Sequence, residues 1–108
     1  MADKYMLVMM TASNEAEGAE LGQKVVEEGL AACCNIVPGV RSIYKWQGKL
    51  MDEKEVLCIM KTREALFEKL KDRLSSLHSY EVPEIIGFDI ASGLGSYLKW
   101  IEDSTESR

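Results

Sequence analysis

The run from Tyr5 to Met10 constrains the fold most, because it is an unbroken series of apolar residues. It is too short for a helix of useful length and is typical of a central strand that is buried on both faces. A chain of 108 residues has room for one hydrophobic core. We therefore expect one domain over residues 1–108, built around this strand.

Two amphipathic helices are predicted. Asn14, followed by Glu17, is typical of a capping box at the start of the first helix. Small and apolar residues then recur at helical spacing, so that this helix can lie close to a sheet: Ala19, Gly22, Val26 and Leu30. Thr62 is the predicted N-cap of the second helix. Its apolar stripe consists of Leu66, Leu70, Leu74 and Leu77.

A long antiparallel hairpin is predicted between the helices. Ala32 to Trp46 has the pattern of one strand, with a bulge or bend at Val37–Gly39, where a proline lacks the backbone donor and a glycine adds freedom. Gln47–Lys49 is a plausible turn, and Glu55–Lys61 returns as the third strand. The third strand is expected to extend back toward residue 51.

The rest of the chain completes an α+β fold. Val82–Pro83 leads into a fourth strand over Ile85–Ile90, and a short helix carries Tyr97–Ile101. The tail from Ser104 is expected to fray. The order β-α-β-β-α-β with a terminal helix is the ferredoxin-like split βαβ arrangement, an antiparallel sheet with helices on one face.

The open face of such a sheet needs a cover of water, ligand or another subunit. The period-two pattern places Tyr44 and Trp46 on the same face of the hairpin, so we expect oligomerisation. The alternative is that these aromatic side chains fold onto the protein's own sheet.

Charge and composition limit the partners and the location. Thirteen basic and eighteen acidic side chains give a net charge of −5, so nucleic acid is not an expected partner. The amino terminus lacks the pattern of a secretory signal, and no apolar run has the length needed to cross a bilayer. We expect no membrane partner and a cytoplasmic location.

Soft metal ligands occur in the chain, and copper is the metal that suits them: Cys33, Cys34, Cys58, His78, Met9 and Met10. Adjacent strand residues point to opposite faces, so Cys33 and Cys34 cannot readily hold one ion, and no CxxC pair is present. The pattern favours reduced thiols and core methionines over ligands.

The segment from Leu77 to Glu84 is the best candidate for the rim of a pocket, because it joins an imidazole, a phenol and two carboxylates at a helix-to-strand connection. A solvated loop in which Pro83 fixes the entry to the strand is the alternative. Lys61 could pair with Glu81 or Glu84, or bind an anion. Local spacing fixes no obvious nucleophile or orienting carboxylate beside His78, the single histidine, so we do not expect an enzyme.

Several blocks of the sequence resemble the CutA divalent-cation-tolerance family and cover nearly the whole chain. The blocks are Ala32–Val40, Ser42–Lys49, Glu55–Leu57, Lys61–Arg63, His78–Ile85 and Tyr97–Trp100. The resemblance implies a ferredoxin-like subunit in a homotrimer, with hairpins that pack across subunits and a cleft that is lined from two chains.

The resemblance also implies a role in tolerance of copper and other divalent metals. Cys33 and His78 match positions that are implicated in metal binding, Met10 stands where some members have a cysteine, and Ser79 replaces a usual proline. The predicted metal ligands are therefore Cys33, His78 and Met10. The residues expected in the cleft are Lys61, Tyr80, Glu81, Glu84, Tyr44, Trp46 and Trp100.

The first functional hypothesis is a trimeric binding protein that takes up a divalent metal, copper above all, without an organic cofactor and without turnover. The second is a signalling module that resembles the trimeric PII regulators and binds a small anionic ligand through Lys61, Arg63 and Arg41. A scaffold whose surface carries the function is the third.

Overall fold

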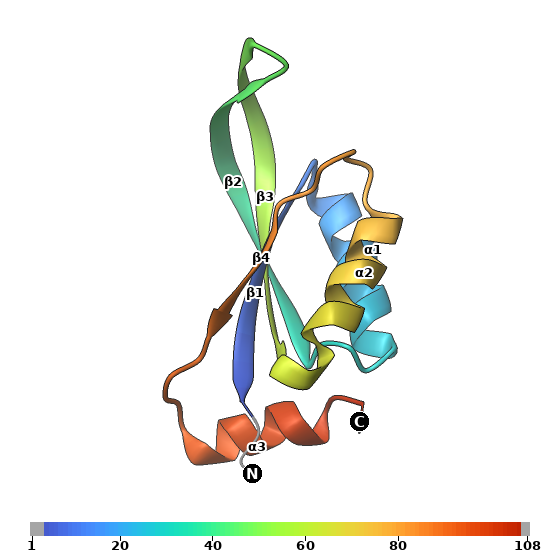
Figure 1. The fold of residues 1–108 in the computed structure, drawn as a ribbon, viewed down its shortest axis with the longest axis vertical. Helices are drawn as coiled ribbons and strands as arrows, with labels where there is room; N and C mark the ends of the chain where they lie inside the picture. The colour runs from blue at the N-terminus through green and yellow to red at the C-terminus, as the bar shows by residue number, and fades with distance from the viewer. Residues whose placement is uncertain (1–3, 107–108) are drawn as a thin grey trace.

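The structure is a computed structural model that describes residues 4–106, and Figure 1 shows its elements. In chain order they are β1 (Tyr5–Ala12), α1 (Glu15–Glu27), β2 (Cys33–Trp46), β3 (Lys49–Arg63), the 3-10 turn η1 (Glu64–Leu66), α2 (Phe67–Leu77), β4 (Ile85–Asp89) and α3 (Gly95–Asp103). This order confirms the predicted ferredoxin-like α+β fold with its additional terminal helix.

The four strands form one antiparallel sheet in the order β2-β3-β1-β4. β1 therefore lies between two partners, as its continuous apolar run predicts. Helices α1 and α2 lie side by side on one face of the sheet, and α3 crosses the end of the sheet opposite the hairpin (Figure 1).

The core lies between the sheet and the two long helices. On β1, Val8, Met10 and Ala12 are fully buried against this helical layer. The other face of the sheet is covered less well: Leu7 is only partly buried, and its cross-strand partner Phe88 is 48% exposed. The central strand is thus buried on one face and half-exposed on the other within one chain.

Helix α1 begins at the predicted N-cap, because the Asn14 side chain accepts a hydrogen bond from the Glu17 backbone N–H at 2.8 Å. Its buried face differs from the prediction: Gly18, Leu21, Gly22 and Val25 are buried. Ala19 and Val26 are exposed. The glycines let the helix touch the sheet, since a Cβ on Gly22 would lie 2.8 Å from the Cys34 sulfur.

The hairpin of β2 and β3 projects beyond the helical layer (Figure 1) and gives the molecule its longest dimension of 46 Å. The strand register shifts between Val37 and Val40, which confirms the predicted bulge. Gln47 and Gly48 close the turn with φ of 51° and 79°, the pair of positive angles that a tight hairpin turn of type I′ requires.

Two expectations about element ends are wrong. Thr62 does not cap a helix but belongs to β3, where its buried hydroxyl donates to the Leu30 carbonyl at 2.7 Å. The tail is not frayed over residues 104–106: Thr105 is buried and accepts a hydrogen bond from Arg63 at 2.9 Å. The Glu106 N–H also donates to the Gly29 carbonyl at 2.7 Å.

Candidate functional site

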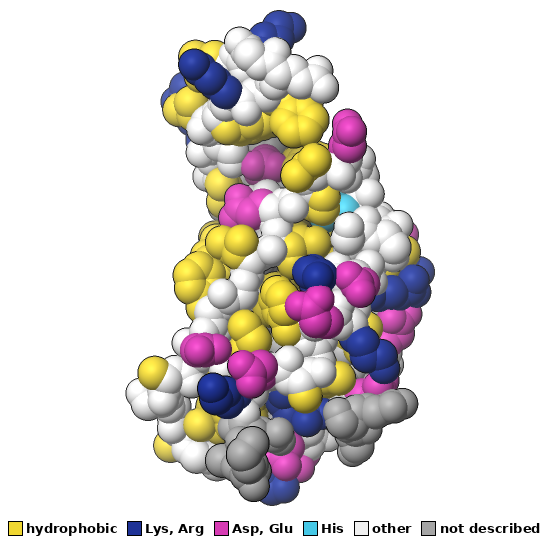
Figure 2. Space-filling view, viewed as in Figure 1, with side chains coloured by type: hydrophobic (Ala, Val, Ile, Leu, Met, Phe, Trp, Pro, Cys, Tyr) yellow, Lys and Arg dark blue, Asp and Glu magenta, His cyan; other side chains and the backbone are white. Residues whose placement is uncertain are grey.

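A cavity of about 340 Å³ lies where the hairpin meets the body of the domain. It is lined by the end of β1, by both hairpin strands and by the loop between α2 and β4. The lining residues are Thr11, Tyr44, Trp46, Glu55, Tyr80, Glu81, Val82 and Glu84. In Figure 2, Lys and Arg side chains gather at the hairpin tip. Acidic and hydrophobic side chains lie together below the tip.

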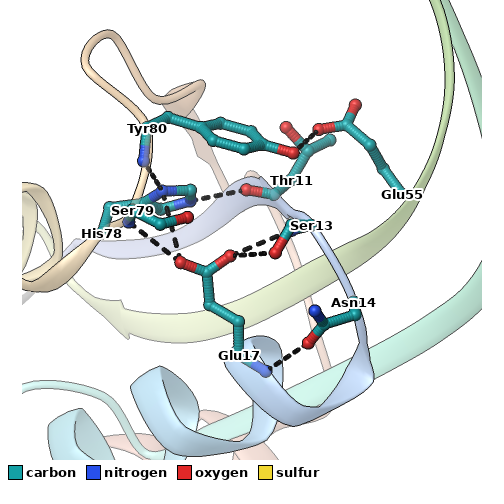
Figure 3. Close-up of polar contacts among 8 residues, drawn as sticks. All are labelled: Thr11, Ser13, Asn14, Glu17, Glu55, His78, Ser79 and Tyr80. Atoms are coloured by element: carbon teal, nitrogen blue, oxygen red, sulfur yellow. Dashed lines mark hydrogen bonds and ion pairs between the residues drawn. The ribbon is translucent and has the colours of Figure 1, made fainter.

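The loop that closes one side of the cavity is anchored by His78, which ends α2 and whose side chain is fully buried. His78 Nε2 lies 2.8 Å from the Thr11 carbonyl oxygen, and Nδ1 lies 3.1 Å from the Tyr80 backbone N–H (Figure 3). A carbonyl only accepts and an N–H only donates, so Nε2 acts as the donor and Nδ1 as the acceptor in these two contacts. Both ring nitrogens are therefore engaged.

Glu17 ties the same loop to the start of α1 (Figure 3). Its Oε1 accepts from the Ser13 backbone N–H at 3.0 Å and from the Ser13 hydroxyl at 2.7 Å, and its Oε2 accepts from the Ser79 backbone N–H at 2.9 Å. Partial burial opposes ionisation, but the hydrogen bonds from Ser79 and Ser13 prevail and lower the pKa of Glu17 to about 2. Glu17 is thus a charged structural group.

Glu55 places a carboxylate in the wall of the cavity, although the residue is only 8% exposed. The Tyr80 hydroxyl donates to Glu55 Oε2 at 2.6 Å. Burial and this hydrogen bond raise the pKa of Tyr80, so the phenol keeps its proton. Tyr80 thereby connects the anchored loop to the hairpin.

Negative charge dominates the environment of the cavity. Desolvation and the charges of Glu53 and Glu55 raise the pKa of Tyr44, which lines the cavity. Within residues 4–106, no hydrogen bond or ion pair neutralises Glu81 or Glu84. None of the lining residues within the described part of the chain is basic, so the charge of this lining attracts cations and repels anions.

The predicted metal ligands Cys33, His78 and Met10 do not converge within one chain. The register aligns Cys33 with Lys61, Leu7 and Phe88 on the open face of the sheet, whereas Met10 is fully buried on the helical face. His78 contacts Thr11, which lies four residues along β1 from Leu7, the residue aligned with Cys33. Four residues of a strand span about 14 Å, so His78 and Cys33 lie at different levels of the sheet. Among residues 4–106, no three His, Cys, Asp or Glu side chains are placed to hold a metal ion.

The cysteines behave as the sequence predicts. All three are free thiols. Cys33 lies on the open face, 3.8 Å from the Tyr97 hydroxyl, and Cys34 lies under Gly22 on the helical face. A hydrogen bond to Cys58 and burial raise the pKa of Cys34, so its thiol stays protonated.

Five of the seven residues expected in the cleft line the cavity: Tyr44, Trp46, Tyr80, Glu81 and Glu84. Lys61 does not, because it lies six residues along β3 from Glu55, and its ammonium donates to the Asn35 side chain instead of pairing with Glu81 or Glu84. Trp100 lies on α3, at the other end of the domain (Figure 1).

The basic residues that an anionic ligand would need do not gather at one place. Arg41 binds Asp52 through two hydrogen bonds of 2.8 and 2.6 Å. Arg63 is buried and donates to Thr105 and to the Glu106 carbonyl. Arg41, Arg63 and Lys61, the cations that the PII-like hypothesis names, therefore do not form one phosphate site.

Sequence reasoning did not identify Thr11, Glu55 or Glu17 as parts of this region, whereas Val82 lies in the segment predicted as the pocket rim. A signal for Glu55 was present, since it precedes Leu57 and Ile59 at a spacing of two on the same face of a strand. A carboxylate in line with apolar residues on an uncovered face is a candidate ligand group. Thr11 and Glu17 contribute through contacts across the fold, which local spacing does not show.

The fold and the cavity define a ferredoxin-like domain with an acidic, aromatic cavity. A sequence model described as CutA1 divalent ion tolerance protein matches residues 6–104. The chain belongs to the CutA1 divalent ion tolerance family.

Relatives and solved structures agree with this membership. The chain is 44% identical to the divalent-cation tolerance protein CutA of Thermus thermophilus, over 92% of this chain and 96% of that protein. It is 42% identical to the chloroplastic protein CutA of Arabidopsis thaliana, over 94% of this chain but only 56% of that protein. The crystal structure of CutA1 from Oryza sativa superimposes with a TM-score of 0.94 at 40% identity, over 97% of this chain and 96% of that one.

Within residues 4–106, no helix has both the length and the apolarity needed to cross a membrane. The relatives from Arabidopsis thaliana and Oryza sativa are named as chloroplastic, and a structure from Archaeoglobus fulgidus is named as periplasmic, so the cytoplasmic location stays a prediction.

Proposed function

We propose that this chain is a self-associating, non-catalytic protein whose acidic cavity binds a divalent metal ion, copper among them, between neighbouring copies. The observation that carries the proposal is the presence of Glu55, Glu81 and Glu84 around one cavity that has no basic lining residue. The name of the family, divalent ion tolerance, points to the same class of ligand.

A second copy is part of the proposal because residues 4–106 of one chain bring no three His, Cys, Asp or Glu side chains together as a metal site. Self-association is supported by the uncovered face of the sheet, where Ile86 and Phe88 are 44% and 48% exposed. A homotrimer that places one copy against the rim of the next would add ligands to Glu81 and Glu84.

The chemistry of the ligands favours a divalent ion over monovalent copper. The cavity offers carboxylate and phenol oxygens, which are hard ligands, whereas monovalent copper prefers thiolate and thioether sulfur. The oxygen ligands of the cavity therefore suit divalent copper, whereas the sulfur ligands predicted from the sequence would suit monovalent copper.

We also propose that the protein has no catalytic activity, because the side chains of His78 and Tyr80 beside the cavity already have hydrogen-bond partners. Both ring nitrogens of His78 are engaged with the backbone, and Tyr80 holds its proton against Glu55. Neither group is poised to move a proton to or from a molecule in the cavity.

Calorimetric titration of the chelator-treated protein with divalent copper, zinc and manganese tests the proposal. We expect saturable binding that Glu84→Gln weakens by about tenfold, because one hard ligand is lost. Glu20→Gln, which removes an exposed carboxylate from α1, is the matched control and should leave the affinity unchanged. Light scattering on the same samples should give three times the 12.1 kDa chain mass.

Two results would contradict the proposal. If no metal binds saturably, or if Glu20→Gln weakens binding as much as Glu84→Gln does, the cavity is not the metal site. If metal binds saturably but light scattering gives the mass of a monomer, the part of the proposal that requires a second copy is wrong. The cavity of one chain would then be the metal site.

A further inference from the structure

The cavity has an aromatic wall that metal binding does not explain. Tyr44 and Trp46 come from β2, on the same face of the hairpin, and Tyr80 comes from the loop after α2. Tyr44 and Trp46 are each only 39% exposed, although they stand on a hairpin that projects beyond the body of the domain. Three aromatic rings and three carboxylates thus share one hollow.

These two kinds of group attract different parts of a ligand. The face of an indole or phenol ring attracts a cation and also makes apolar contact with alkyl groups around it. A metal ion gains little from such a wall, because it requires several oxygen, nitrogen or sulfur ligands at coordination distance. Residues 4–106 provide no such set of three acidic, histidine or cysteine side chains.

The size of the cavity limits the ligand. Small-molecule sites typically measure about 300–1,000 Å³, so a volume of about 340 Å³ suits a compact molecule. Glu55 contributes a negative charge from the wall, and its Oε2 is oriented by the Tyr80 hydroxyl at 2.6 Å. A ligand there would meet a fixed charge on one side and rings on the other.

We propose that this cavity binds a small organic ammonium ion, with its alkyl groups against Trp46, Tyr44 and Tyr80 and its charge near Glu55. Such binding needs neither a metal ion nor a second copy, and it therefore stands apart from the proposed metal function. The ligand class follows from the pairing of aromatic faces with uncompensated carboxylates.

Proton NMR titration with tetramethylammonium tests the inference, and tert-butanol serves as a neutral probe with a similar branched alkyl shape. Methyl groups that sit over ring faces are shifted upfield, so the tetramethylammonium signal should move upfield and saturate. We expect tert-butanol to bind at least about tenfold more weakly, because it lacks the charge that rings and carboxylates attract.

Two substitutions locate the site. Trp46→Leu should weaken tetramethylammonium binding by about tenfold, because it removes the indole face and keeps an apolar side chain. Glu55→Gln should weaken binding to a similar extent while its amide oxygen still accepts from Tyr80. Trp100→Leu is the matched control, because Trp100 is 43% exposed on α3 and lies away from the cavity.

The outcomes separate this inference from the metal proposal. Equal binding of tert-butanol, no saturable shift, or an equal loss in Trp100→Leu and Trp46→Leu would overturn it. Divalent copper titrated into Trp100→Leu should bind as in the parent chain, because Trp100 lies on α3, away from the cavity. Loss of metal binding in Glu84→Gln with tetramethylammonium binding absent throughout would support the metal site alone.

Discussion

Two acidic regions meet at the loop between α2 and β4 and differ in how their oxygens are used. Glu17, in the first turn of α1, accepts three hydrogen bonds from Ser13 and Ser79. Glu81 and Glu84, in the loop itself, line an open cavity, and no hydrogen bond or ion pair within residues 4–106 occupies them.

The difference separates a structural carboxylate from a ligand carboxylate. A carboxylate whose oxygens are satisfied by fixed backbone donors stabilises the fold and has little left to offer a ligand. One that faces a cavity without donors keeps its charge available for a cation. The same distinction applies to His78, whose position in a polar loop suggests a ligand and whose hydrogen bonds make it an anchor.

The largest expected effect comes from His78→Ala, which removes the anchor. The substitution leaves the Thr11 carbonyl and the Tyr80 N–H without their partner, so the free energy of unfolding should fall by about 3 kcal/mol. Urea denaturation at a fixed protein concentration measures this. Unchanged stability together with lost copper binding would instead identify His78 as a ligand.

Glu17→Gln should have the next largest effect, about 2 kcal/mol at neutral pH, because charge-assisted hydrogen bonds are lost. The pKa of Glu17 is lowered from 4.5 to about 2 in the folded chain. Its ionised form therefore stabilises the fold above about pH 4.5, and this contribution disappears as the pH falls toward 2. Denaturation of both proteins across this range should show the difference shrinking with acidity, and a constant difference would contradict this assignment.

Tyr80→Phe should cost about 1 kcal/mol, because the buried Glu55 carboxylate loses its donor while the ring remains in place. Thermal unfolding of the variant beside the parent chain measures the loss. Tyr44→Phe is the comparison, since no hydrogen bond of that hydroxyl is found within residues 4–106. Equal losses would mean that the Tyr80–Glu55 contact does not hold the loop to the hairpin.

Glu84→Gln should have the smallest effect on stability, within about 0.5 kcal/mol, because the side chain is exposed and makes no contact that the fold requires. The substitution should instead weaken the binding of a divalent cation. A chemical denaturation curve recorded beside the metal titration tests both statements. Strong destabilisation by this substitution would erase the distinction between the two acidic regions.

The sequence predicts the order and type of the elements, because alternation, helical spacing and turn residues are local signals. Asn14 and Glu17 locate the start of α1, and the break near Pro38 locates the bulge. The buried side of α1 is predicted only in part: Gly22 is buried as expected, but Gly18 and Val25 are buried in place of their neighbours Ala19 and Val26.

The site was predictable where polar residues cluster along the chain and not where the fold joins distant segments. Glu81 and Glu84 are sequence neighbours, so their loop was identified as a pocket rim. The opposite placement of Cys33 and Met10 depends on the pairing of three strands, which no local spacing reports. Thr62 has the sequence of an N-cap but makes its hydrogen bond to Leu30 across the fold.

The place of β1 between β3 and β4 has a consequence for the order of synthesis. Among the strands of this sheet β1 is synthesised first, yet its partners Val56–Arg63 and Ile85–Asp89 follow only much later in the chain. Until they emerge, both edges of β1 offer unpaired backbone groups on an apolar strand, which is the condition that favours aggregation. A chain interrupted before residue 85 would keep one of these edges open, so the last strand protects the first.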